Sequence, residues 1–226
     1  MEKVKFVTEF DNKTIGQWAT EWWNWYLSED SDNNQPAGNI RFLRGGYSHD
    51  HTFNDNRQAL SITPETAIFF PVIDSMFTFP HNNHKDHNGR EFKIKSLNDE
   101  ELRTEDDIRR AILRERTSCK IASISNTADG DRQDIIPDGH WQRAESSKFT
   151  LKVSKNSKFK NDFKPPLPAS SGIKSDNDYN YFDALCGGYY ILIESLPRSD
   201  KPYHIHFEAR GESGYTNSGT YDIKVQ

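Results

Sequence analysis

Short apolar blocks, separated by polar stretches, recur along the 226-residue chain and predict a mainly β fold. Several blocks alternate apolar and polar positions, as half-buried strands do. The predicted strands cover residues 3–7, 40–43, 59–62, 67–73, 148–153, 189–193, 203–207 and 220–225. Because the last three are short and closely spaced, they favour an antiparallel β-sandwich of jelly-roll or immunoglobulin-like type.

Segment 67–73 differs from the other blocks because it is continuously apolar. Such a run indicates a strand that is buried on both faces. Pro71 interrupts it and has no backbone N–H to donate, so we expect either an edge position or a β-bulge there.

The N-terminal region predicts an amphipathic helix. Thr14 and Gln17 have the spacing of a capping box, in which each side chain bonds to the backbone of the other residue. Apolar residues follow at intervals of three and four, which places them on one helical face. This stripe consists of Ile15, Trp18, Trp22 and Trp25. We expect the helix to end near Leu27 and to cover the β-core, although aligned indoles also suit a sugar-stacking platform.

A second helix is expected to begin at Thr104. Its first turn is acidic and arginines follow, an order that suits the helix dipole. Because its apolar stripe is narrow, this helix should lie on the surface. The chain is expected to form a single domain, residues 1–226, with a variable insertion at about 80–147 and a long loop at about 161–180.

The net charge of −5 and the lack of a sustained basic run argue against nucleic acid as a partner. The densest basic stretch, residues 148–164, is interpreted as a solvated strand edge and loop. The sequence contains no apolar signal core and no membrane-length segment, so we expect a soluble cytoplasmic protein without a membrane partner, or a secreted one if a leader has been removed. Cys119 and Cys186 are too few for a disulfide framework, but a single bridge between them stays open.

The sharpest candidate for metal chemistry is the segment His204-Ile-His206-Phe-Glu208. On a strand, alternation places both imidazoles and the carboxylate on one face. Such ligands can hold a divalent zinc or iron ion, the one cofactor that the sequence suggests, and the segment resembles the metal strand of a cupin. The further glycine-bounded motif of a cupin does not follow. The alternative is that the histidines face solvent or hydrogen-bond to a neighbouring strand.

Other chemistry has weaker signals. Histidines within residues 81–87 and 49–51 can collect a metal, but polar loops often contain histidine without one. The sequence has no nucleophile elbow, no phosphate-binding loop and no C-x-x-C motif. Cys186, which precedes two glycines, is a conceivable nucleophile, but a cysteine at the start of a buried strand is more often a packing residue.

Binding without catalysis is the leading functional hypothesis. Surplus aromatic residues, polar loops and the lack of a catalytic motif favour a glycan or another small molecule as ligand. The candidate ligand-binding residues are Trp23, which lies off the helical stripe and should be more exposed, and the pair His140-Trp141, which can stack on a sugar. The alternatives are a metal-dependent enzyme that uses the histidine strand, and an effector-like protein that binds a protein partner through the tryptophan helix.

Several blocks resemble a family of uncharacterised bacterial and fungal proteins. Its members begin with a G-x-W-x-x-x-W-W-x-W helix and end with an H-x-I-H-F strand and a T-Y-x-I-x-V strand. The matching segments here are residues 14–25, 41–45, 64–73, 188–196, 204–207 and 220–225. They cover about the first 80 and last 40 residues. The resemblance implies a shared fold and no particular activity, because none is established for the family. Many members carry a cysteine pair where Asn39 and Leu60 stand here, which favours a reducing compartment.

Overall fold

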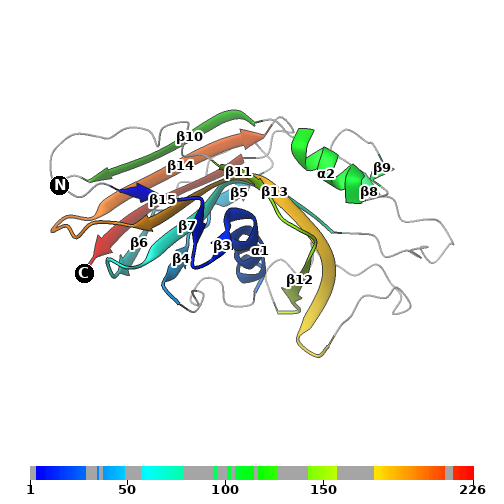
Figure 1. Ribbon diagram of the computed structural model, residues 1–226, viewed down its shortest axis with the longest axis horizontal. Helices are drawn as coiled ribbons and strands as arrows, with labels where there is room; N and C mark the ends of the chain where they lie inside the picture. The colour runs from blue at the N-terminus through cyan, green and yellow to red at the C-terminus, as the bar shows by residue number, and fades with distance from the viewer. Residues whose placement is uncertain are drawn as a thin grey trace.

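The computed structural model describes residues 4–28, 35, 38–48, 57–78, 94–95, 101–102, 105–114, 117–126, 142–156, 176–211 and 216–226. Within these residues the chain is mainly β and contains two helices (Figure 1). This confirms the predicted mainly β class, the N-terminal helix and the second helix. Neither of these two helices is long and apolar enough to cross a membrane.

The elements agree with the apolar blocks of the sequence, although several strands are longer than predicted. The helices are α1 (Ile15–Tyr26) and α2 (Glu105–Arg114). The strands are β1 (Lys5–Phe6), β2 (Glu9–Phe10), β3 (Lys13–Thr14), β4 (Ile40–Phe42), β5 (Gly46–Ser48), β6 (Arg57–Ile62), β7 (Ala67–Thr78), β8 (Ile94–Lys95), β9 (Glu101–Leu102), β10 (Thr117–Asn126), β11 (Gln142–Glu145), β12 (Phe149–Ser154), β13 (Tyr179–Ser195), β14 (Tyr203–Gly211) and β15 (Thr216–Val225). Strands β2, β3, β5, β8, β9, β10 and β11 were not predicted from the sequence.

Most of the strands belong to two larger sheets. The first sheet has the order β1-β13-β7-β4, and β11 and β12 also pair with β13. The second sheet has the order β10-β14-β15-β5, and β6 also pairs with β15. Most neighbours are antiparallel, as expected, but β4 pairs with β7 in parallel and β6 pairs with β15 in parallel. Strands β10 and β11 come from the range predicted as a variable insertion, and each is part of one of these sheets.

The first sheet lies between α1 and the second sheet. On one face, Phe70 of β7 and Ile191 of β13 share a hydrophobic core with Phe207 of β14. The rings of Phe70 and Phe207 stack with their centroids 4.8 Å apart. On the other face, Phe69 and Tyr190 pack in a second core with the tryptophans of α1. Strand β7 is therefore buried on both faces, as its continuous apolar run predicts.

The start of α1 is determined locally. The backbone N–H of Thr14 donates to Gln17 Oε1 (2.8 Å), and the backbone N–H of Gln17 donates to Thr14 Oγ1 (3.4 Å), which completes the predicted capping box. Leu27 caps the other end, as expected. Gly16 allows this first turn to contact β11 directly, because a Cβ atom there would lie 2.5 Å from the carbonyl oxygen of Glu145.

Pro71 lies at a β-bulge within β7. Tyr189 of β13 pairs with Ile73 and Tyr190 pairs with Pro71, so Val72 is an extra residue on β7. Of the two predicted alternatives, the bulge is correct and the edge position is wrong, because β7 lies between β13 and β4 in the sheet order. The side-chain amide of Asn217, from β15 in the second sheet, donates to the carbonyl oxygens of Pro71 (3.2 Å) and Val72 (3.0 Å).

One face of β13 has three different environments along its length. Ile191 belongs to the core between the sheets. In the middle of the strand, Leu185 packs against Ile108 of α2. Further towards the start of β13, Tyr179 and Tyr181 alternate along the same face and are partly exposed. A strand that begins at the surface therefore continues into the centre of the protein.

Candidate functional site

The tryptophan stripe of α1 is part of the core. Trp22 is 0% exposed and Trp18 is 3% exposed. The indole N–H of Trp22 donates to the carbonyl oxygen of Leu43 (2.8 Å), and its ring stacks on Tyr26 with centroids 4.8 Å apart. The core interpretation of the helix is confirmed, and the buried indoles of Trp18 and Trp22 have no free face for a sugar.

Trp23 was expected to be exposed, and this expectation is wrong. Its side chain is 8% exposed and packs edge-on against Trp22, with ring centroids 5.1 Å apart. The physical reason is that α1 packs against β12 as well as β13, so its buried face is wider than one stripe. Trp25, which lies on the predicted stripe, is more exposed than Trp23.

The histidine strand has the predicted alternation. In β14 every second residue, including Ile205 and Phe207, is buried. The residues between them, His204, His206 and Glu208, share the outer face of the second sheet and are partly exposed.

Both histidines hydrogen-bond to the neighbouring strand. His204 bonds through Nδ1 to Asp222, which lies directly opposite on β15. His206 Nδ1 lies 3.0 Å from the hydroxyl of Thr220, its own cross-strand partner, and His206 Nε2 lies 3.2 Å from Glu208 Oε1. In the part of the chain that the structure describes, no group of three or more His, Cys, Asp or Glu side chains is placed to hold a metal ion. The arrangement is that of cross-strand side-chain pairs.

The pair formed by Arg57 and Asp222 makes stability depend on pH. A hydrogen bond from Arg57 lowers the pKa of Asp222 below its ordinary value of 3.8, and the bond to His204 adds to this effect. When the pKa of a carboxyl group is lower in the folded protein than in the unfolded chain, its contribution to stability is fully present at pH values above the pKa of the unfolded chain. This contribution is lost as the pH falls through the pKa of the folded state. Because the two side chains are 61% and 23% exposed, we expect a contribution below about 1 kcal/mol.

This expectation is tested by urea unfolding between about pH 2 and pH 6. Asp222→Asn should lower the free energy of unfolding near pH 6, and its difference from the wild type should shrink at the acid end. Asp200→Asn, which changes an exposed acid, should follow the wild type. A difference that stays constant over the whole range would contradict the assignment.

Cys186 is buried and its thiol is free. Burial raises the pKa of Cys186 to about 12, and the negative charge of Asp74 adds to this effect, while side-chain hydrogen bonds with Ser146 and Tyr190 act in the opposite direction. Since the thiolate is the reactive form, such a pKa disfavours the nucleophile alternative. The packing interpretation fits this environment.

Native Cys186 is therefore expected to react with a thiol reagent at about pH 8 at least roughly a hundredfold more slowly than in the unfolded chain. The rate is measured with a chromogenic disulfide in a Cys119→Ser variant, so that Cys186 is the one thiol observed. The same variant in denaturant is the reference. Equal rates in the two states would show that the thiol is accessible and reactive.

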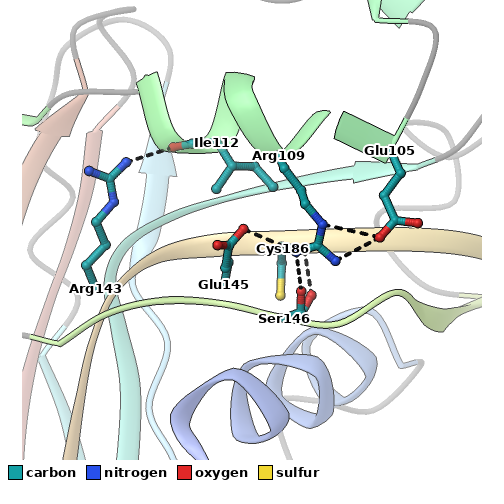
Figure 2. Close-up of polar contacts among 7 residues, drawn as sticks. All are labelled: Glu105, Arg109, Ile112, Arg143, Glu145, Ser146 and Cys186. Atoms are coloured by element: carbon teal, nitrogen blue, oxygen red, sulfur yellow. Dashed lines mark hydrogen bonds and ion pairs between the residues drawn. The ribbon is translucent and has the colours of Figure 1, made fainter. Parts of the chain in front are cut away.

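A polar network attaches α2 to the first sheet (Figure 2). Arg109 bonds to Glu105 within its own helix (2.8 Å) and to Glu145 at the end of β11 (3.2 Å). It also donates to the carbonyl oxygen of Ser146 (3.3 Å), whose hydroxyl accepts from the backbone N–H of Cys186 (3.0 Å). These bonds raise the pKa of Arg109, led by the bond to Glu105.

Two further contacts position α2. Arg143 donates to the carbonyl oxygen of Ile112 (3.2 Å), as Figure 2 shows. Gly187 of β13 lies beneath the helix, where a Cβ atom would come within 2.4 Å of Ile112 Cγ2. Arg109 and Arg143 both bond to groups of the protein itself, so the arrangement fits attachment of a helix better than binding of a ligand.

Sequence reasoning missed a group of partly exposed side chains at the start of β13. Tyr179 and Tyr181 have ring centroids 6.3 Å apart and an interplanar angle of 50°. Asp176 accepts from the Tyr181 hydroxyl (2.6 Å) and from the backbone N–H groups of Asp178 (2.9 Å) and Tyr179 (2.7 Å). We call Asp176, Tyr179 and Tyr181 the tyrosine patch.

The tyrosine patch has an ordered geometry. Hydrogen bonds to Asp176, led by the one from Tyr181, lower the pKa of this carboxyl group, and the same bond raises the pKa of Tyr181. The signal in the sequence was the alternation of Tyr179, Tyr181 and Asp183. Residues 179 and 180 fall within the loop predicted at about 161–180, which is rich in proline, serine and asparagine, so the start of this strand is not apparent from the sequence.

Some predicted site residues lie outside the described residues. They are His140 and Trp141, and the loop residues His49, Asp50, His51, His81, His84 and His87. Their roles stay predictions.

Comparisons with known proteins were made for the sequence and for the fold. No family model, no curated protein and no solved structure matches the chain.

Proposed function

We propose that this chain is a non-catalytic binding domain and that its ligand is a glycan bound at the tyrosine patch. The observation that carries the proposal is the pair of adjacent, partly exposed rings of Tyr179 and Tyr181 beside the carboxylate of Asp176. An aromatic face packs against the apolar face of a pyranose, and a fixed acceptor can bond to its hydroxyl groups. A preorganised carboxylate loses less entropy when a ligand binds.

The position of the patch supports this proposal. Phe182 and Ala184, on the opposite face of β13, belong to the core that includes the tryptophans of α1. This part of the strand is therefore supported by packed side chains on the face away from the patch. Leu185, farther along the patch face, is covered by α2. The face from Tyr179 to Asp183 continues beyond this helix and is partly exposed.

We also propose a more specific fold type and a family for this chain. The two sheets would form a β-sandwich of jelly-roll or immunoglobulin-like type, and the chain would belong to the family that its motif blocks resemble. The order of the blocks supports this proposal, since they occur in α1, β4, β7, β13, β14 and β15. The two parallel strand pairs would be departures from a purely antiparallel sandwich.

The functional proposal is tested on a glycan array, followed by titration calorimetry with each oligosaccharide that binds. Tyr181→Ala should abolish binding, because it removes one stacking ring. Tyr181→Phe is the matched control, since it keeps the ring and should retain most of the affinity. Thermal unfolding of both variants checks that they are folded. A glycan whose affinity is unchanged by Tyr179→Ala and by Tyr181→Ala, or an array without any signal, would overturn the proposal.

A further inference from the structure

The charge beside the tyrosine patch narrows the class of ligand. Strand β12 pairs antiparallel with β13, and Lys152 lies directly opposite Tyr181. Side chains that are directly opposite in an antiparallel pair lie on the same face, with their Cβ atoms about 5 Å apart. Lys152 is exposed, so its ammonium group is on the face of the patch and within reach of a ligand stacked on Tyr181.

Two other lysines near the patch already have partners, whereas the exposed Asp178 adds a negative charge near Tyr181. Lys148 forms an ion pair with Asp183 (2.7 Å). Lys155 donates to the carbonyl oxygen of Asp176, whose carboxylate accepts the bonds from Tyr181 and the backbone. Across the described ranges, Lys152 has no ion-pair partner for its ammonium group.

The backbone of Lys152 is held in place by α1. Asn24 accepts from the backbone N–H of Lys152 (2.8 Å), and its amide donates to the carbonyl oxygen of Thr150 (3.4 Å). These two bonds attach β12 to the helix, because the amide of Asn24 bonds to backbone groups of β12 as the backbone of a neighbouring strand would. The backbone of Lys152 is therefore held in place, and its ammonium group lies at the end of a flexible side chain next to the rings of the tyrosine patch.

We infer that the glycan bound at the tyrosine patch is anionic, and that Lys152 pairs with its carboxylate or sulfate group while Tyr179 and Tyr181 stack on the sugar ring. This inference rests on the proposed function. A bond between a charged donor and a charged acceptor is stronger than a neutral one, and at an exposed site it is weakened by salt. We expect the anionic ligand to bind about three- to tenfold more tightly than its neutral form at low ionic strength.

The experiment compares matched probes by titration calorimetry. Tetragalacturonate is compared with its methyl ester, and a sulfated oligosaccharide is compared with its desulfated form. The protein variants are Lys152→Gln, Lys152→Glu and Tyr181→Ala, with Lys224→Gln as the control for an exposed lysine on the second sheet. Lys152→Gln should remove the preference for the anionic probe, Lys152→Glu should reverse it, and Lys224→Gln should leave it unchanged.

The outcomes separate this inference from the function on which it rests. If neutral and anionic probes bind equally, and Tyr181→Ala abolishes both while Lys152→Gln changes neither, the charge assignment is wrong and glycan binding stands. If no probe and no other glycan binds, and the patch instead binds a protein in a manner sensitive to Tyr181→Ala, then the charge assignment and the proposed glycan-binding function are both wrong. A preference for the anionic probe that added salt weakens and Lys152→Gln abolishes would establish the inference.

Discussion

Trp22→Ala is expected to lower the free energy of unfolding by about 3–5 kcal/mol. The side chain is fully buried, stacks on Tyr26 and donates its indole N–H to the carbonyl oxygen of Leu43. Truncation would leave a cavity between α1 and the first sheet and a buried carbonyl without its donor. Urea unfolding, followed by far-ultraviolet circular dichroism, measures the change.

Trp25→Ala provides the matched control, because Trp25 belongs to the same helix but is partly exposed. It should cost clearly less than Trp22→Ala. A loss below about 1 kcal/mol for Trp22→Ala would show that α1 contributes little to the core.

Asn217→Leu is expected to lower the free energy of unfolding by about 1–3 kcal/mol, although the two side chains have the same number and branching of heavy atoms. Asn217 is 0% exposed and donates both amide bonds to carbonyl oxygens at the β7 bulge, one on Pro71 and one on Val72. Leucine would leave these buried carbonyls without donors. It would also remove the hydrogen bonds by which the second sheet is attached to the first at this point.

The same measurement with Asn177→Leu, at an exposed position, is the control and should change stability by less than about 0.5 kcal/mol. An Asn217→Leu protein as stable as the wild type would mean that the bulge carbonyls find other donors. Gly45 should be equally intolerant of substitution, because a Cβ atom there would lie 1.8 Å from Asn217 Oδ1.

Features that depend on neighbouring residues could be predicted from the sequence. The capping box of Thr14 and Gln17 and the apolar spacing of three and four specify α1 from within its own turns. The alternation in β14 specifies which residues face the core, because successive side chains on a strand point to opposite faces. Pro71 indicated a break in regular pairing for the same local reason, since it has no N–H to donate.

The candidate sites depended on contacts between distant segments. The hydrogen-bond partners of His204 and His206 are Asp222 and Thr220, which the register of β15 places opposite them. Trp23 is buried because β12, far along the chain, packs beside α1. Neither relation leaves a periodic signal in the sequence.

The sequence by itself determined the mainly β class, the two helices and the inward-facing residues of β14, because each follows from local hydrogen bonding or from the period of apolar positions. Only the tertiary structure decided that Trp23, which lies off the predicted stripe, is core as well, and that Tyr179 and Tyr181 form a partly exposed aromatic pair. Exposure depends on which elements cover a side chain, and that is decided by the pairing of strands far apart in the chain. In this protein β12 pairs with β13 in the first sheet. On one face of this strand pair the flank of α1 is buried, and on the other face Lys152 lies beside Tyr181.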